Sequence, residues 1–208
     1  MISGRITFIR VAAALCVAAV ALLLVPALLL AQTDNGAKPD NGRKQARAMR
    51  VPAGAINIDG RLDDPAWRDA PPITDFVQRE PTEGAPPTDR MEVRFVYDND
   101  ALYVGARMFS DGPIQAPMGR RDNGEQAEHL LVSLDTYLDR RTASTFGTTA
   151  TGVRLDTYYA SDRPWDNDDS FDPVWQARTS MDAQGWSAEL WIPFSQLRFT
   201  ERSPQVWG

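Results

Sequence analysis

A polar stretch at residues 161–169 holds one large aromatic side chain, Trp165. Its neighbours offer little apolar surface, so we expect the indole to be exposed, although a loop tryptophan can also cover the edge of a core. An exposed indole can stack on the flat C–H face of a sugar, and guanidinium, carboxylate and amide groups can bond the sugar hydroxyls. Arg163, Asp166 and Asn167 supply these groups beside the ring. The stretch therefore predicts a ligand-binding surface suited to carbohydrate.

Two more aromatic residues near this stretch, Tyr159 and Trp175, complete the predicted ligand-binding set. Trp175 lies in a segment of alternating polar and apolar residues, where a place in the core is the alternative. Trp186 has the same alternative. Trp191 lies five positions after Trp186, and side chains at odd separations along a strand point to opposite faces. These two tryptophans therefore cannot share one face of the strand.

Acidic residues in the same region reproduce part of a calcium-binding loop. Asp166, Asp168 and Asp172 fall at positions one, three and seven of such an oxygen-rich loop. The sixth position lacks the glycine that an EF-hand needs, and the twelfth is Ala177 where a bidentate glutamate belongs. These carboxylates are therefore candidate ligands of a calcium site of another type, and the alternative is a solvated acidic loop.

The residue types that most enzyme classes need are scarce. The only cysteine is Cys16, in an apolar N-terminal run, and the only histidine is His129, so thiol catalysis, histidine triads and multi-histidine metal sites have little material. Glycoside hydrolysis needs two facing carboxylates, and no pair stands out among the acidic candidates Glu128, Asp135, Asp156 and Glu189. For Glu189 we expect a structural hydrogen bond or ion pair. The sequence therefore predicts a binding protein, not an enzyme, with no required cofactor.

Composition favours one globular domain with an appendage. The chain has 208 residues, of which 43% are hydrophobic and 24% charged. Its formal net charge of −6 repels phosphate backbones, so we expect no nucleic-acid partner. Because the folded region has no cysteine, an ordinary hydrophobic core and not a disulfide framework must hold it.

The first 31 residues have the order of an export signal. Arg5 and Arg10 precede a run from Val11 to Ala31 that has no charged residue. As a helix this run would extend about 31 Å, enough to cross a bilayer, so an uncleaved anchor is the alternative to a cleaved signal. Residues 32–50 are polar and predict a flexible linker. We therefore expect an exported bacterial protein of the periplasm, cell surface or outer membrane.

Beyond residue 50 the main signal is alternation of apolar and polar residues, which is typical of half-buried strands. Residues 91–97 and 102–108 alternate in this way. Asp98, Asn99 and Asp100 between them are turn formers, so the two runs predict a hairpin. The face expected to be buried carries Met91, Val93, Phe95, Tyr97, Leu102, Val104, Ala106 and Met108.

Further strands are predicted at residues 56–58, 73–78, 129–134, 144–149, 153–159, 174–179 and 185–192. About nine short strands with little helical periodicity predict an all-β domain, a two-sheet antiparallel β-sandwich of the jelly-roll type. One short helix is expected after Asp63 and Asp64, with an Asp cap and with Pro65 in the first turn. It should carry Trp67 inward.

Three motifs in this region resemble carbohydrate-binding module family 9. IDGRLDDPAW at residues 58–67 resembles that family's opening DG-x-LDE-x-AW, VYDNDALYV at residues 96–104 resembles its YD-x-x-x-LYV hairpin, and GWSAELWIPF at residues 185–194 resembles its closing GW-x-AE-x-x-IP strand. The resemblance implies a sugar-binding sandwich over residues 51–208, with Trp67 packed against it. Because family 9 modules hold structural calcium, it also makes Asp59 and Asp63 alternative metal ligands.

QLRF at residues 196–199 and QVWG at residues 205–208 resemble a subgroup in which such a module precedes a large domain of unknown function, of outer-membrane β-barrel type. This implies a sandwich truncated at its C-terminal edge and a barrel partner outside this chain. The function implied is non-catalytic binding of polysaccharide or oligosaccharide, in glycan recognition or catabolism. The alternatives are a structural N-terminal domain of a barrel protein that binds no sugar, and an accessory part of a glycoside hydrolase.

Overall fold

The computed structural model describes residues 44–124, 126–163 and 165–208. The predicted signal or anchor and residues 32–43 of the predicted linker lie outside the described residues. The chain divides into two compact units, Met1–Gln45 and Ala46–Gly208, and the second contains all the elements described below. Among the described residues, no helix has the length and apolar character needed to cross a bilayer.

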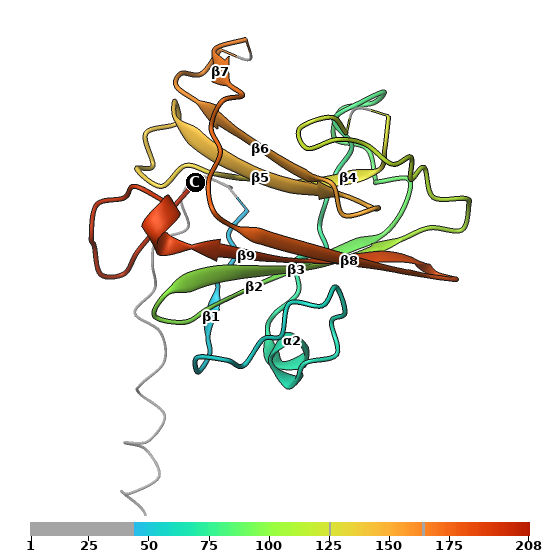
Figure 1. Ribbon diagram of the computed structural model, residues 1–208, viewed down its shortest axis with the longest axis horizontal. Helices are drawn as coiled ribbons and strands as arrows, with labels where there is room; N and C mark the ends of the chain where they lie inside the picture. Colours follow the sequence, from blue (N-terminus) through green and yellow to red (C-terminus); the bar gives the residue numbers. More distant parts are fainter. Residues whose placement is uncertain (1–43, 125, 164) are drawn as a thin grey trace, which may run out of the picture. The chain divides into compact units, whose positions relative to one another are not determined.

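The second unit is a sandwich of two β-sheets, drawn as two layers in Figure 1. The five-stranded sheet has the order β1-β2-β3-β9-β8 and the four-stranded sheet the order β4-β5-β6-β7. The strands of the five-stranded sheet are β1 (Met49–Arg50), β2 (Met91–Tyr97), β3 (Ala101–Phe109), β8 (Gln176–Asp182) and β9 (Gly185–Pro193). The strands of the four-stranded sheet are β4 (His129–Leu134), β5 (Ala143–Thr149), β6 (Arg154–Tyr159) and β7 (Asn167–Asp168). Every described pair except β1–β2 is antiparallel. The predicted two-sheet antiparallel sandwich is confirmed.

The β2–β3 hairpin forms where the sequence predicts it. Asp98 closes its turn, because one carboxylate oxygen accepts the N–H groups of Asp100 at 2.8 Å and Ala101 at 2.9 Å. The other oxygen accepts the Tyr103 hydroxyl at 2.9 Å. A short carboxylate that bonds its own turn in this way fixes the register of the strands on either side.

The space between the sheets holds the larger hydrophobic core, called the inner core here. The predicted inward faces of β2 and β3 contribute to it, together with alternate residues of β9 and apolar residues of β4 and β5. Phe146 and Trp175 meet edge to face near its centre, with ring centroids 5.4 Å apart. Because truncation of a buried aromatic costs about 3–5 kcal/mol, this pair contributes strongly to the cohesion of the sheets.

A second apolar cluster, called the outer core here, covers the opposite face of the five-stranded sheet. It is built by the chain before β2, including the helix α2 (Pro65–Asp69), which Figure 1 shows on the far side of that sheet from β4–β7. Trp67 is buried there and Trp191 packs against it, whereas Trp186 is buried in the inner core. The prediction that the last two tryptophans face opposite ways is confirmed.

A buried carboxylate on β9 fastens the outer layer to the sheet. Glu189 is 0% exposed. One oxygen accepts the Trp67 indole N–H at 2.8 Å, and the other accepts the N–H groups of Asp59 and Gly60, both at 2.8 Å. Burial raises the pKa of Glu189, and the bonds from these three donors act in the opposite direction. The opening and closing motifs of the sequence therefore meet at this one side chain, whose structural role was expected.

Gly60 allows the outer layer to approach this closely. Its φ of 90° is unfavourable for residues with a side chain, and an added Cβ would lie 2.6 Å from the backbone carbon of Thr179. The carbonyl oxygen of Gly60 also accepts the Ser187 hydroxyl at 2.6 Å. A glycine is thus required where the opening motif crosses the sheet.

Several local predictions are wrong. Residues 56–58 and 73–78 form no strand; Ile73 makes a single bridge to Val93, and Ile56 is buried in the outer core. These residues cover the sheet and its edge without adding a strand to it. Periodicity in the sequence does not distinguish a covering segment from a strand. Asp64 does not cap α2 with its side chain, because its carboxylate accepts the Asn57 N–H at 2.9 Å. The short strand β1 lies inside the predicted linker.

Replacing Glu189 with Gln is expected to lower the free energy of unfolding by about 2–3 kcal/mol. The side-chain amide would turn its NH2 group toward at least one of these three N–H donors. Urea unfolding followed by tryptophan fluorescence measures the change. Glu201→Gln alters an exposed residue and is the matched control, expected to stay within about 0.5 kcal/mol of wild type. Equal stability of both variants would contradict the fastening role.

Candidate functional site

Trp165 lies between β6 and β7, in a hairpin at the edge of the four-stranded sheet. Figure 1 shows β7 at the top of the view. β7 pairs with the end of β6, opposite Tyr158 and Tyr159. In the turn between them, the Asp166 N–H donates to the carbonyl oxygen of Arg163 at 3.0 Å. The Trp165 side chain remains 78% exposed. The expected exposure is therefore confirmed, and the ring is carried by a backbone that paired strands hold.

An open hollow of about 360 Å³ lies beside this hairpin. Apolar atoms make up most of its accessible lining, although nine of its ten lining residues also carry a polar or charged group. The lining consists of Arg79, Asp135, Arg140, Arg141, Thr142, Ala143, Tyr159, Ser161, Asp162 and Arg163. The hairpin supplies one wall and the connection from β4 to β5 supplies another. Two members of the predicted ligand-binding set, Tyr159 and Arg163, are thus brought together in one concave surface.

The other polar members of the set lie in the same hairpin but outside the lining of the hollow. Asp166 and Asn167 are both exposed. The side-chain amide of Asn167 donates to Asp169 at 2.6 Å, which orients it along the hairpin. These two residues border the exposed indole, and Tyr159 and Arg163 border the hollow.

Trp175 does not belong to an accessible site. Its side chain is 1% exposed and its indole N–H donates to Asp156 at 3.2 Å. The guanidinium of Arg154 bonds the Trp175 carbonyl oxygen at 2.7 Å and lies 5.8 Å from the ring centroid. No face of the ring is left for a sugar, so the prediction that Trp175 contacts ligand is corrected. Its alternation in sequence marked the inward face of the inner core.

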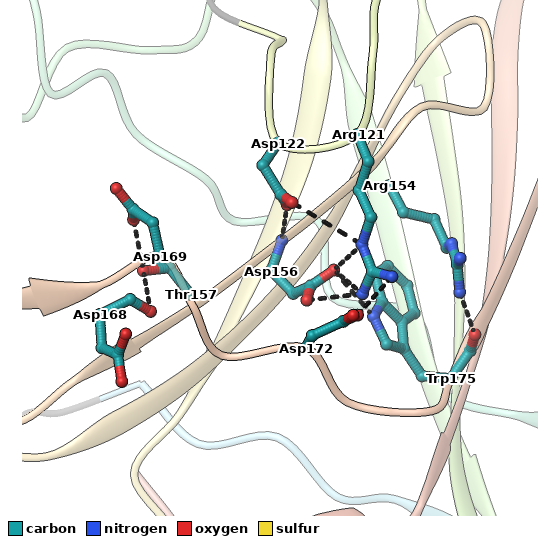
Figure 2. A network of polar contacts seen from close by, with 9 residues as sticks. All are labelled: Arg121, Asp122, Arg154, Asp156, Thr157, Asp168, Asp169, Asp172 and Trp175. Atoms are coloured by element: carbon teal, nitrogen blue, oxygen red, sulfur yellow. Dashed lines mark hydrogen bonds and ion pairs between the residues drawn. The ribbon is translucent and has the colours of Figure 1, made fainter.

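The partner of Trp175 belongs to the polar network in Figure 2. Asp156 is 4% exposed, and its two oxygens accept a bidentate pair from Arg121, with the shortest distances at 2.8 Å. Arg121 also pairs with Asp172 and lies 3.7 Å from Asp122. Burial raises the pKa of Asp156, and the adjacent guanidinium opposes that change. The network ties the β3–β4 connection to β6 and to the chain before β8.

The residues of the predicted calcium site do not fit a metal ion. Asp172 pairs with Arg121, whose positive charge occupies the centre that a cation would need. Asp168 accepts the N–H and the hydroxyl of Ser170 at 2.9 and 2.5 Å, and Figure 2 shows it pointing away from the Arg121 group. Within the described part of the chain, no three acidic, histidine or cysteine residues are placed to hold a metal. Asp166, Asp168 and Asp172 are therefore not assembled into one site.

The carboxylates considered for hydrolysis are all committed to structural bonds. Glu128 accepts the Gln115 N–H at 2.9 Å and the Trp186 indole N–H at 3.1 Å. Asp135 accepts two backbone N–H groups of its own loop. With the partners of Asp156 and Glu189 given above, none of these four groups has an oxygen free of a donor. These four carboxylates therefore have a structural role, which is to hold separate segments of the chain together by hydrogen bonds.

Comparison with solved structures shows the same fold in carbohydrate-binding modules. A family 9 module from Caldicellulosiruptor kristjanssonii, solved with cellotriose, matches with a TM-score of 0.50 and 16% identity over 71% of this chain and 67% of that one. A candidate carbohydrate-binding protein from Bacteroides uniformis matches with a TM-score of 0.51 and 12% identity over 72% of each chain. No protein-family model and no curated protein matches the sequence. At these identities the likeness establishes a family 9-like fold.

Sequence reasoning missed the second wall of the hollow. Arg140, Arg141 and Thr142 lie between the strands β4 and β5, and Arg79 comes from the chain before β2. The available signal was a pair of adjacent arginines in a predicted turn. It was not informative alone, because the approach of this turn to the β6–β7 hairpin depends on sheet pairing.

Replacing Arg121 with Ala is expected to lower the free energy of unfolding at neutral pH by roughly 2–4 kcal/mol, because Asp156 would be a buried charge without its ion-pair partner. Since the folded-state pKa of Asp156 is raised, this carboxyl stabilises the fold most at acid pH, and that contribution is lost as pH rises through the raised value. The deficit of the variant should therefore shrink as pH falls.

Chemical unfolding over a series of pH values measures this dependence. Arg121→Lys keeps a positive charge without the bidentate geometry and should show a smaller deficit. A deficit for Arg121→Ala that is the same at acid and neutral pH would contradict the role of Arg121 as counter-charge to Asp156.

Proposed function

We propose that the unit Ala46–Gly208 is a non-catalytic carbohydrate-binding domain that holds a glycan on the β6–β7 hairpin. The observation that carries this proposal is the 78% exposed indole of Trp165, two residues along the chain from Arg163, which lines an open hollow. The indole would stack on the apolar face of a sugar ring. Tyr159 and Arg163 in the hollow, with Asp166 and Asn167 beside the ring, would bond its hydroxyls.

The physical argument is one of pre-organisation. An exposed tryptophan gains nothing from the core, yet this one is carried on a hairpin whose strands are paired and whose turn is closed by backbone bonds. A backbone held in this way loses little conformational entropy on binding, which favours affinity. A family 9-like module that was solved with cellotriose has the same fold, and this likeness supports a sugar as the ligand.

We further propose that the domain acts outside the cytoplasm, in glycan recognition or polysaccharide catabolism. The support is the order of the first 31 residues, two arginines followed by an uncharged apolar run. An attached outer-membrane barrel is the corresponding proposal for a partner, and its support is the sequence resemblance of residues 196–199 and 205–208. In such a protein the domain would present glycan to the remainder of the molecule.

Replacing Trp165 with Ala is expected to weaken sugar binding at least about fivefold, since a stacked ring contributes on the order of 1–3 kcal/mol to a complex. Affinity electrophoresis and calorimetry against cello-oligosaccharides, xylan and polygalacturonate measure the change. Met118→Ala is the matched control, because Met118 is an apolar residue of another loop with 83% exposure. It should bind as wild type does.

Two outcomes would contradict the proposal. Absence of wild-type binding to every polysaccharide would leave a structural domain as the better account. Equal binding by wild type and Trp165→Ala would place any sugar site elsewhere. Far-ultraviolet circular dichroism of the variant checks that the fold is retained.

A further inference from the structure

The connection between β4 and β5 is held in one conformation by two carboxylates. Asp135 accepts the N–H groups of Asp139 at 3.1 Å and Arg140 at 2.6 Å. Asp139 accepts the N–H groups of Arg141 and Thr142, both at 2.8 Å. Arg140 has a φ of 61°, a left-handed conformation that a non-glycine residue keeps where surrounding bonds hold it. Two adjacent arginines therefore line the hollow from a backbone in a defined position.

Four arginines contribute to the lining of the hollow, namely Arg79, Arg140, Arg141 and Arg163. All four residues are exposed. Within residues 44–124, 126–163 and 165–208, none of these guanidinium groups has an ion pair. Elsewhere among the described residues, Arg90, Arg94, Arg107 and Arg121 have carboxylate partners, and other arginines such as Arg61 and Arg68 have none. The positive charge of these four arginines is therefore available to bind another molecule.

Only two carboxylates line the hollow against these four cations. Both oxygens of Asp135 accept backbone N–H groups and the residue is 9% exposed, so this charge is directed into the loop. Asp162 is exposed. In a chain with a formal net charge of −6, the result is a local positive field in a concave surface, which attracts anions.

We propose that the hollow lined by Arg79, Arg140, Arg141 and Arg163 recognises the acidic group of an anionic polysaccharide, a uronate carboxylate or a sugar sulfate. This inference rests on the proposed sugar-binding function and names its ligand class. A guanidinium group is planar and presents paired N–H donors that match the two oxygens of a carboxylate or sulfate. The side chains of Tyr159, Thr142 and Ser161 add a ring and hydroxyls that suit the rest of a sugar.

The placement of Arg163 joins this hollow to the exposed indole. Arg163 lines the hollow and precedes Trp165 by two residues in the same turn. One sugar of an acidic chain can stack on the indole while a neighbouring sugar places its anionic group among the arginines. A nucleic acid has the same anion chemistry, but it needs a run of phosphate contacts that the overall negative charge of this chain opposes.

The test compares the full-length wild-type protein with the double variant Arg140→Gln/Arg141→Gln. Affinity electrophoresis and calorimetry use polygalacturonate, dextran sulfate, neutral xyloglucan and single-stranded DNA as probes. The wild type should bind polygalacturonate or dextran sulfate at least about tenfold more tightly than xyloglucan. The better of the two acidic probes identifies carboxylate or sulfate as the group recognised. Raising sodium chloride from about 0.05 to about 0.5 M should reduce the preference.

The double variant should lose this preference, so that its affinities for acidic and neutral probes become similar. The control Arg61→Gln/Arg68→Gln removes the same amount of charge from two exposed arginines beside the outer core. This control should keep the preference for acidic probes. Stronger wild-type binding to xyloglucan than to the acidic probes would overturn this inference and leave the sugar-binding proposal standing. DNA binding equal to that of the acidic probes would overturn it in favour of a general anion site. Absence of binding to every polysaccharide would overturn both.

Discussion

The buried carboxylate of Glu189 connects the two ends of the domain sequence. It stands on β9 and accepts N–H groups from Asp59, Gly60 and Trp67, all in the segment that covers the outer face of the five-stranded sheet. Burying a carboxylate away from solvent costs free energy unless hydrogen-bond donors surround it. Because the covering segment supplies these donors to Glu189, the segment and the sheet stabilise each other. With the outer layer on one side and the inner core on the other, most of β3 and β9 is buried on both faces.

The same use of carboxylates recurs through the domain. Asp98 closes the β2–β3 turn, Asp135 holds the β4–β5 connection, and Asp156 joins two loops through Arg121. Each accepts N–H donors that would otherwise lack partners. An acidic composition therefore does not mean an acidic surface everywhere. Because these carboxylates are turned inward, the arginines around the hollow keep their charge for contacts outside the chain.

The proposed site lies at the edge of the sandwich, where rigidity and access coincide. β7 is only two residues long, yet it holds the hairpin against β6. Edge positions expose side chains on loops that sheet hydrogen bonds still restrain. The ion pair between Arg121 and Asp156 also holds β6, so the hairpin is positioned by strand pairing and by this ion pair.

Much of the fold could be predicted because strand alternation and turn chemistry are local properties. The β2–β3 hairpin and the strands β4, β5, β6 and β9 follow from side chains two residues apart that face one layer. Where apolar residues cover a sheet without joining it, as Ile56 and Ile73 do, the same local pattern led to the wrong element. Periodicity records which face is apolar and does not record what lies against it.

For the site, the sequence by itself determined that Trp165 has polar neighbours with little apolar surface to cover an indole, and so predicted its exposure. Only the tertiary structure decided that Trp175 is sealed in the inner core, that Asp172 is paired with Arg121, and that Arg140 and Arg141 line one hollow together with Arg163. The physical reason is distance along the chain. Contacts between segments that are far apart in sequence arise from sheet pairing and layer packing, which no single stretch of residues encodes.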